Sequence, residues 1–354
     1  MSLPHSEHLM KLVTLRRNST SQDVAQNSLV DRFGRVHSSL RVSVTDRCNI
    51  RCRYCMPGGD VAFMPTERWL SFDSIARLVR TLSKVGIRKI RITGGEPLMR
   101  PKLHELIRMI GDLGSIEDLA LTTNGMLLAD QADALKRAGL MRINISLDTL
   151  QEETFFNISR RQGVSKVLEG IEAALDQRFD VRLNAMVLRD MNLDEVTSLV
   201  SFARSRNLPI RFIEFMPLDA DREWNQERMV SGKELRERLS KEFGRLLPES
   251  RTDQSQPATD YRFEDGKGVV GFIDTVTQPF CSGCNRLRLT ADGILRNCLF
   301  GKEGWDIGPL VQEGCNEAQI LDVVRDCVAK KHAAHGISEA GFQPPALAMY
   351  QIGG

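Results

Sequence analysis

Six short runs of β-branched and apolar residues, each followed by a longer segment with helical spacing, constrain the fold of this chain more than any other feature. The runs cover 40–45, 89–93, 118–123, 142–147, 181–187 and 210–215. Strands that alternate with helices form parallel βα units. Six units predict an α/β fold, an incomplete (β/α)6 barrel of parallel strands, although periodicity alone does not exclude an open doubly wound sheet.

The first helical segment has recognisable ends. Ser71 can cap its start, and Gly86 suits its end. The apolar positions between them fall on one helical face: Phe72, Ile75, Ala76, Val79 and Leu82. The same periodicity predicts helices within 102–113, 165–176 and 193–206.

Polar segments follow the predicted strands at their carboxyl ends. They are Cys48 and its loop, GGEP at 94–97, TTNG at 122–125, SLDT at 146–149 and FMP at 215–217. In parallel α/β folds the ligand lies at these ends of the strands. We therefore expect all five segments to surround one site.

The chain of 354 residues divides into three predicted parts. Residues 1–35 are polar and are read as a flexible tail or a docked arm, 36–247 as the barrel, and 248–354 as a small antiparallel β region entered through a linker at 248–260. Within that region, RLRLTADGILRNC predicts a hairpin with a two-residue turn at Asp292 and Gly293. This register pairs Ala291 with Ile294 and places Cys298 opposite Leu287.

The composition of the chain limits which classes of partner and which cellular compartment are expected. The chain has 48 basic and 46 acidic residues, so its overall charge does not indicate a nucleic-acid partner. No apolar run is long enough for a membrane span, and the N-terminus lacks the apolar core of a secretory signal. We expect no membrane partner and a cytoplasmic location, or the mitochondrial matrix if the source is eukaryotic. In a reducing compartment the eight cysteines are expected to be ligands or free thiols.

Three cysteines, Cys48, Cys52 and Cys55, lie within eight residues. Structural zinc usually takes four protein ligands, and this loop supplies three. A cubane iron–sulfur cluster held by three cysteines would leave one iron open for a further ligand.

A second triad, Cys281, Cys284 and Cys298, again supplies three thiols, and taken alone it suits structural zinc as well as an iron–sulfur cluster. Cys315 and Cys327 belong to neither triad and are expected to be buried thiols. The histidines show no metal-binding spacing, and His332 and His335 are expected on the surface.

The spacing of the first triad, with Tyr54 before the last cysteine and GGEP after the second strand, resembles the radical S-adenosylmethionine superfamily. The segment CSGCNRLRLTADGILRNCL closely resembles the C-terminal region of the GTP 3′,8-cyclase family of molybdenum cofactor biosynthesis. This resemblance extends from VDRFGRVHSSLRVSVTDRCNIRCRYCMP to the terminal Gly353 and Gly354, and in that family the glycine-ended tail reaches the active site and is needed for activity.

The resemblance implies a radical lyase that converts GTP to 3′,8-cyclo-7,8-dihydro-GTP with two [4Fe-4S] clusters and S-adenosylmethionine. It also implies an electron-donating reductase and a downstream cyclic pyranopterin monophosphate synthase as partners. A homodimer is the assembly considered, although the sequence does not fix the oligomeric state. The alternatives are another radical enzyme with an auxiliary cluster, such as a peptide maturase, and a non-catalytic zinc or electron-transfer protein.

Residue roles follow from the same resemblance. The six cysteines of the two triads would bind the clusters. Residues implied for S-adenosylmethionine are Tyr54, Gly95, Glu96, Ser146 and Met216. Those implied for GTP are Arg41, Arg91, Thr122, Arg182, Arg286, Leu287 and Arg288, of which Arg286 and Arg288 are also expected to be catalytic. Lys89 is equally compatible with a substrate contact and a solvated strand end. At Arg182 the family usually has lysine, so phosphate contacts there are expected to differ.

Overall fold

The computed structural model describes residues 28–251, 253–312, 314–339 and 341–353. Its centre is a sheet whose strands pair in parallel and in chain order, as the six runs predicted. These strands are β1 (Ser39–Ser43), β2 (Lys89–Thr93), β3 (Asp118–Thr123), β4 (Arg142–Ser146), β5 (Asp180–Met186) and β6 (Ile210–Ile213).

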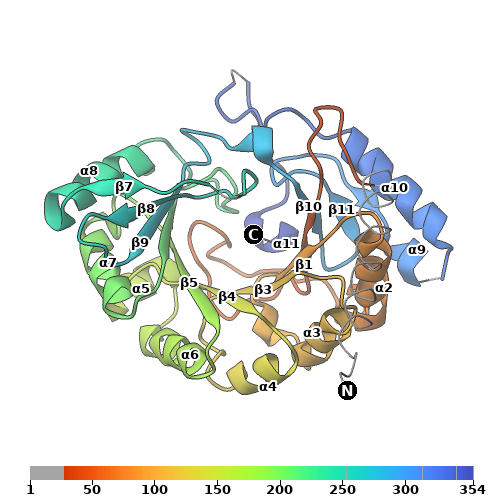
Figure 1. Ribbon diagram of the computed structural model, residues 1–354, viewed down its shortest axis with the longest axis horizontal. Helices are drawn as coiled ribbons and strands as arrows, with labels where there is room; N and C mark the ends of the chain where they lie inside the picture. Colours follow the sequence, from red (N-terminus) through yellow and green to blue (C-terminus); the bar gives the residue numbers. More distant parts are fainter. Residues whose placement is uncertain (1–27, 252, 313, 340, 354) are drawn as a thin grey trace, which may run out of the picture.

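The C-terminal strands extend both edges of this sheet. At one edge β9 (Val269–Ile273) pairs in parallel with β6 and is followed outward by the antiparallel β8 (Thr259–Phe263) and β7 (Leu246–Pro248). At the other edge β10 (Arg286–Leu289) pairs in parallel with β1 and carries the antiparallel β11 (Ile294–Arg296) and β12 (Trp305–Asp306). The sheet curves around a central space (Figure 1), so its two C-terminal extensions face each other across it.

Helices lie around the outside of the curved sheet, and one short helix lies within it (Figure 1). The outer helices are α2 (Phe72–Ser83), α3 (Leu103–Gly111), α4 (Ala132–Arg137), α5 (Glu152–Ser159), α6 (Val164–Asp176), α7 (Val196–Ser205), α8 (Gly232–Phe243), α9 (Gly308–Gln312) and α10 (Glu317–Ala329). The inner helix is α11 (Met349–Ile352), beside the C-terminus. The Ser71 side chain accepts a hydrogen bond from the Ser74 amide at 3.1 Å, which confirms the predicted cap of α2. No helix in the described part of the chain is long and apolar enough to cross a membrane.

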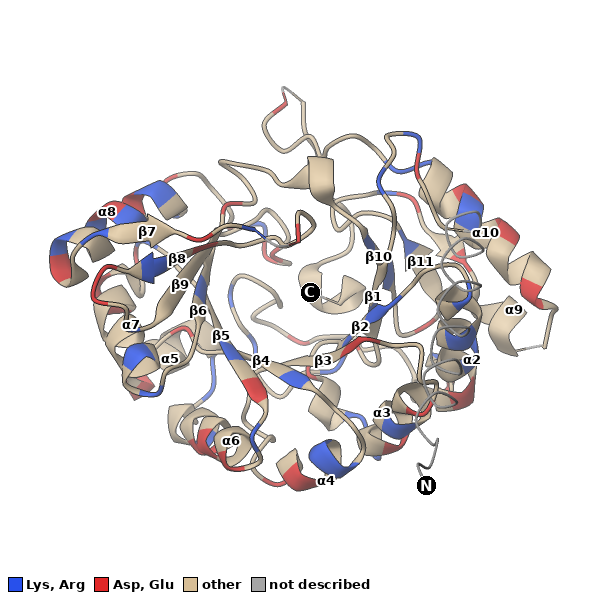
Figure 2. Ribbon diagram, in the orientation of Figure 1, with Lys and Arg blue, Asp and Glu red and all other residues tan. Residues whose placement is uncertain are grey.

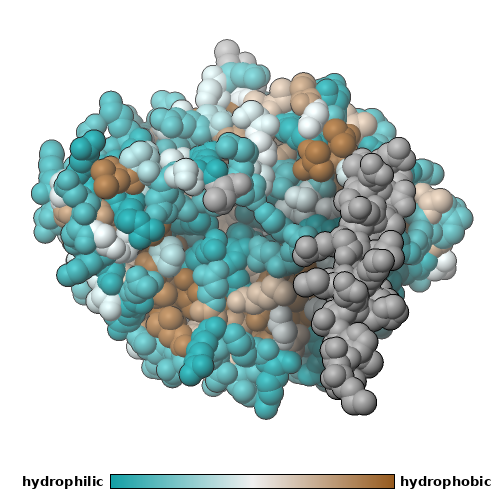
Figure 3. Space-filling model, in the orientation of Figure 1, coloured by the Kyte–Doolittle hydropathy of each residue, from teal (hydrophilic) through white to brown (hydrophobic). Residues whose placement is uncertain are grey.

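Alternation along the strands separates the core from the central space. In β4, Ile143 and Ile145 are buried in the main hydrophobic cluster between sheet and helices. Ile90 and Ile92 of β2 are buried in the same cluster. The residues between them carry polar side chains, which alternation directs to the opposite face. The exterior seen in Figure 3 is mainly hydrophilic with scattered hydrophobic patches, because most large apolar side chains lie in this cluster.

The predicted register of the C-terminal hairpin is wrong by one residue. Arg288 pairs with Arg296, so Cys298 aligns with Arg286 and not with Leu287. The hydroxyl of Thr290 accepts a hydrogen bond from the Ile294 amide at 2.9 Å, and Gly293 adopts φ +94°. These features close a three-residue loop with a left-handed glycine in place of the two-residue turn.

Two segments predicted as tail and linker pack on the sheet. Residues 1–27 of the predicted tail lie outside the described residues, but Leu29 is buried and Val30 forms an antiparallel bridge with Val36. Residues 249–258 connect the antiparallel strands β7 and β8, and Asp253 of this loop pairs with Lys89. The loop therefore reaches from the sheet edge to β2.

Candidate active site

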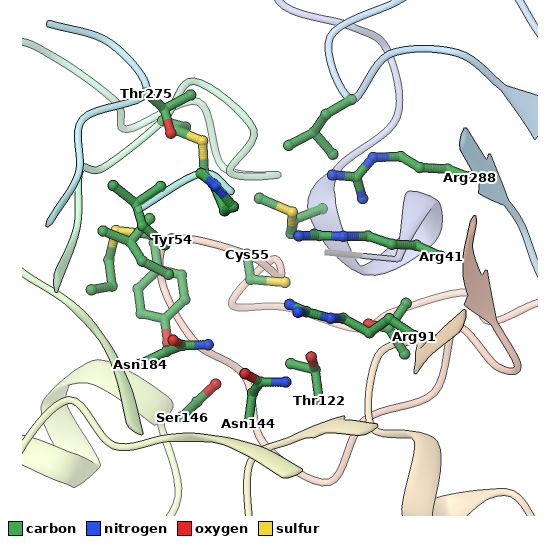
Figure 4. Close-up of a pocket in the computed structure, with 18 of the residues that line it drawn as sticks. Arg41, Tyr54, Cys55, Arg91, Thr122, Asn144, Ser146, Asn184, Thr275 and Arg288 are labelled. Atoms are coloured by element: carbon green, nitrogen blue, oxygen red, sulfur yellow. The ribbon is translucent and has the colours of Figure 1, made fainter. Parts of the chain in front are cut away.

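A cavity of about 310 Å³ lies within the curved sheet and brings together most of the predicted site residues. Side chains from opposite walls point into it, with arginines on one side and Tyr54, Asn144, Ser146 and Asn184 on the other (Figure 4). Fifteen predicted site residues line it: Arg41, Cys48, Cys52, Tyr54, Cys55, Arg91, Gly95, Thr122, Ser146, Met216, Cys281, Cys284, Arg286, Arg288 and Cys298. Both cysteine triads thus share one cavity.

Three predicted site residues do not line this cavity. Glu96 is fully buried behind it, and Leu287 is fully buried in the main hydrophobic cluster. Arg182 pairs with Asp180 at 3.0 Å on its own strand. Leu287 thus lies on the opposite face of β10 from Arg286 and Arg288, as alternation along a strand requires.

The two glycines of GGEP hold the start of the first cysteine loop. The Gly95 amide donates to Thr45 O, and the Glu96 amide donates to Arg47 O, each at 2.8 Å. A Cβ on Gly95 would lie 2.5 Å from Arg47 O, and one on Gly94 would lie 2.6 Å from Thr45 O. Only glycine permits this approach, so the motif fixes the backbone that leads into Cys48.

Glu96 joins the GGEP segment to β3. Its carboxylate accepts hydrogen bonds from the Thr123 hydroxyl and the Asn124 amide, both at 2.7 Å, and from the Leu98 amide at 3.0 Å. Burial raises the pKa of Glu96 to about 7 despite these bonds. The Asn124 side chain in turn donates to the Cys48 sulfur at 3.8 Å, so Glu96 orients a group that contacts the first triad.

The first triad has the donor set of a metal cluster. Burial raises the pKa of Cys52, and the neighbouring Asp148, Cys48 and Cys55 raise it further. Burial likewise raises the pKa of Cys48 to about 12. Three buried thiols whose surroundings disfavour the thiolate form fit a positively charged centre that compensates their negative charge.

The second triad is surrounded by cations. Cys281 begins a 3-10 turn (Cys281–Gly283) before β10, Cys284 directly follows this turn, and Cys298 follows β11. The Arg286 guanidinium donates to the Cys284 sulfur at 3.5 Å. Burial raises the pKa of Cys284, but Arg286 and Lys331 outweigh it and bring the value to about 6. The cations around Cys284 therefore favour its thiolate form.

Neither triad is closed around a single ion. Among the described residues, no group of three His, Cys, Asp or Glu side chains is arranged to hold one metal ion. A cubane binds each cysteine at a different iron and so spaces the three sulfurs more widely than one zinc ion does. Each triad supplies three thiols, one fewer than the four ligands of structural zinc and the number that a cubane with one open iron takes.

Three arginines concentrate positive charge on one wall (Figures 2 and 4). Arg41 pairs across the sheet with both Arg91 and Arg288, so like charges lie side by side on adjacent strands. Burial lowers the pKa of Arg91 to about 9 and that of Arg288 to about 10, and cationic neighbours add to both effects. Buried, adjacent cations are costly unless an anion meets them. The wall is suited to a polyanionic ligand.

Polar groups that the sequence analysis missed complete the cavity. Asn144, Asn184 and Arg211 line it from β4, β5 and β6. Each occupies a position that alternates with apolar residues along its strand, as Arg41 and Arg91 do. Applied to all six strands, this alternation would have found them.

Asp148 and His335 also belong to the cavity lining. Asp148 accepts a hydrogen bond from the Tyr54 hydroxyl at 2.6 Å and one from the Met186 amide at 2.8 Å. The prediction that His335 lies on the surface is wrong, because its ring contacts Thr275 O at 3.0 Å. His332 is exposed and Cys327 is buried, both as expected, whereas Cys315 is only partly buried.

The C-terminal segment lies inside the curved sheet and forms part of the cavity wall. Met349 of α11 lines the cavity, and its amide donates to Leu218 O at 3.1 Å. The Arg288 guanidinium donates to Gly353 O. Gly353 adopts φ +81°, and a Cβ there would lie 2.8 Å from the Ser43 Cβ. The tail is thus held against β1 and β10 at a position that requires glycine, while Gly354 lies outside the described residues.

Two family models match the chain. The radical SAM superfamily model matches residues 42–203, and the molybdenum cofactor synthesis C model matches residues 208–337. Together they cover both cysteine triads.

Curated relatives match over most of the chain. A GTP 3′,8-cyclase from Rhodopirellula baltica is 49% identical over 92% of this chain and 92% of its own length. Another from Mycobacterium sp. (strain KMS) is 41% identical, covering 92% of this chain and 93% of its own.

Solved structures show a similar fold at low identity. Streptococcus suis SuiB bound to its precursor peptide SuiA superposes with a TM-score of 0.60 at 13% identity, covering 87% of this chain and 68% of that chain. Native anSMEcpe with bound AdoMet gives a TM-score of 0.54 at 15% identity, covering 79% of this chain and 81% of that chain.

Proposed function

This chain belongs to the GTP 3′,8-cyclase family of radical S-adenosylmethionine enzymes, and on that premise we propose which of its residues carry out the reaction. The enzyme converts GTP to 3′,8-cyclo-7,8-dihydro-GTP, the first step of molybdenum cofactor biosynthesis. The observation that carries the residue assignments is the single cavity lined by two cysteine triads and by a wall of arginines, of which Arg288 is buried.

The curved sheet is proposed to be an incomplete barrel. Cys48, Cys52 and Cys55 would hold the first [4Fe-4S] cluster at the carboxyl ends of its strands. When bound, this cluster and S-adenosylmethionine supply a carbon radical that can take the hydrogen from C3′ of GTP. The GGEP backbone holds the cysteine loop, and the Tyr54 hydroxyl is fixed by Asp148 beside the same loop. These groups orient the cosubstrate and exclude water from it.

Arg41, Arg91 and Arg288 would bind the triphosphate of GTP. Buried guanidinium groups make charge-assisted hydrogen bonds to phosphate oxygens, and the anion relieves their mutual repulsion. Thr122 supports this assignment, because its buried hydroxyl has no hydrogen-bond partner within the described residues and lines the same cavity.

Cys281, Cys284 and Cys298 would hold a second [4Fe-4S] cluster, whose open iron would supply a binding position for the guanine of GTP. The fit rests on the three thiols lining the cavity and on the cations that favour the thiolate of Cys284. Substrate bound between this centre and the arginines would be anchored at both ends. Such anchoring places C3′ for reaction by removing translational and rotational freedom.

An electron-donating reductase and a downstream synthase that consumes the product are proposed partners, since the reaction needs an electron and yields an intermediate. The cytoplasm is the proposed location because thiolate-bound clusters persist in a reducing compartment.

The deciding experiment uses GTP deuterated at C3′. Iron- and sulfide-reconstituted protein is incubated anaerobically with S-adenosylmethionine, a reductant and the labelled GTP, and mass spectrometry follows the label. We expect deuterium in 5′-deoxyadenosine and a product with the mass of the cyclised nucleotide. Unlabelled 5′-deoxyadenosine would contradict abstraction from C3′, and its absence from protein that holds reduced clusters would contradict the catalytic assignment.

A further inference from the structure

Lys331 lies two residues after the end of α10 and is 3% exposed, a rare environment for a lysine. Its ammonium group has three neighbours within hydrogen-bonding distance: Asn297 O at 2.7 Å, Arg286 O at 2.9 Å and the Cys284 sulfur at 3.5 Å. An ammonium group has three N–H donors, so each has a partner. Two of these partners are neutral carbonyl groups.

In the described part of the chain, Lys331 forms no ion pair with a carboxylate within 4 Å, and its hydrogen bonds go to two carbonyl groups and a thiol. Its cationic neighbours, Arg35 and Arg286, disfavour an additional positive charge there. The groups that favour it are the thiols of Cys284 and Cys298. A buried charge without an opposite charge is strongly unfavourable, so the second triad in its thiolate form is the natural counter-ion of Lys331.

The same side chain connects the two strands that carry the triad. Arg286 begins β10 two residues after Cys284, and Asn297 immediately precedes Cys298 after β11. The Asn297 side chain also donates to Cys327 O in α10 at 2.7 Å. Lys331 therefore fixes the spacing of two cysteine-bearing segments against α10.

Lys331 and Arg286 both donate to Cys284, but only Arg286 lines the cavity. A substrate that enters the cavity can engage Arg286 directly. Lys331 lies outside the lining, so its hydrogen bond to Cys284 does not face the substrate.

We propose that Lys331 is a positioning residue that holds Cys284 and supplies a fixed positive charge and hydrogen bond to the second cluster, raising its reduction potential. This inference rests on the proposed second cluster. Hydrogen bonds to cysteine sulfur and nearby positive charge both stabilise the reduced, more negative form of an iron–sulfur centre. Lys331 would thus set how easily the substrate-binding cluster accepts an electron, without touching the substrate.

The test isolates the second cluster in full-length protein with Cys48, Cys52 and Cys55 replaced by serine. In this background Lys331→Met removes the charge, Lys331→Arg keeps it, and Lys330→Met is the control, because Lys330 is exposed and pairs with Asp326. Each variant is reconstituted anaerobically, its iron and sulfide are measured, and its cluster is titrated against potential by electron paramagnetic resonance.

At the midpoint potential of the parent, we expect Lys331→Met to show about a tenfold lower ratio of reduced to oxidised cluster, equivalent to about 59 mV for one electron. Lys331→Arg should shift less, and Lys330→Met should not shift. Full iron content with an unchanged midpoint in Lys331→Met would overturn the inference. Loss of the cluster in Lys331→Met but not in Lys331→Arg would support it, and equal loss in both would overturn it.

If the parent protein, which lacks the first triad but keeps Lys331, binds no iron, the proposed second cluster is wrong and the inference about Lys331 is wrong with it. This outcome is distinguishable from the others because it occurs with Lys331 intact.

Discussion

Replacing Gly353 with alanine tests whether the C-terminal tail must dock in the cavity. Gly353 adopts φ +81° and ψ +94°, a region that residues with a Cβ rarely occupy. An added Cβ would also lie 2.8 Å from the Ser43 Cβ and 3.0 Å from the Thr93 Cγ2. Backbone strain alone costs about 1–3 kcal/mol, which corresponds to about a 5–150-fold shift toward the undocked tail.

We therefore expect Gly353→Ala to lower GTP turnover by about tenfold or more, with the melting temperature unchanged because the tail can leave without unfolding the sheet. Gly341→Ala is the matched control. Gly341 has a similar φ of +87°, but a Cβ there would meet nothing within 4 Å. The assay is the initial rate of GTP-dependent 5′-deoxyadenosine formation in reconstituted protein. A wild-type rate in Gly353→Ala would refute the reasoning, and so would equal losses in both variants.

Three further predictions concern the two clusters and the N-terminal segment. Cys281→Ser should retain the first cluster, seen as about half of the wild-type iron, yet abolish GTP turnover; full turnover would exclude the second cluster from the reaction. Gly95→Ala should displace the backbone near Arg47 and weaken binding of S-adenosylmethionine in equilibrium dialysis, and unchanged binding would contradict this. Burial lowers the pKa of His37 to about 4, so the folded state is fully stabilised above pH 6.5 and loses about 3 kcal/mol as pH falls to 4. Urea unfolding at several pH values should show this loss, and His37→Gln should remove it.

Local patterns in the sequence predicted the strands and the first helix well. Strand β2 has the same bounds as the alternating run KIRIT that predicted it, and Ser71 caps α2 as expected. The same alternation holds for Asn144 and Arg211, which line the cavity although the family resemblance did not point to them.

Other features depend on contacts that no local pattern encodes. The hairpin register follows from the Thr290 hydroxyl, a side-chain contact that competes with the two-residue turn. The contact of Asp253 with Lys89 joins a polar loop to a distant strand. His335 reaches Thr275 O only because the chain after α10 returns to the cavity. Lys331 gave no signal in the sequence, since its burial is a consequence of tertiary packing.

The parallel pairing of β1 with β10 has a consequence for how the enzyme is made. Ser39 pairs with Arg286, so β1 can complete its pairing only after β10, near the end of the chain, has been synthesised. Pairings so distant in sequence form slowly, and an unpaired strand edge invites aggregation in the meantime. A nascent chain that stops before residue 286 would leave β1 with an open edge on the ribosome. Newly made enzyme should therefore depend on chaperones, and a separately supplied C-terminal fragment should rescue a truncated chain by adding the missing strand.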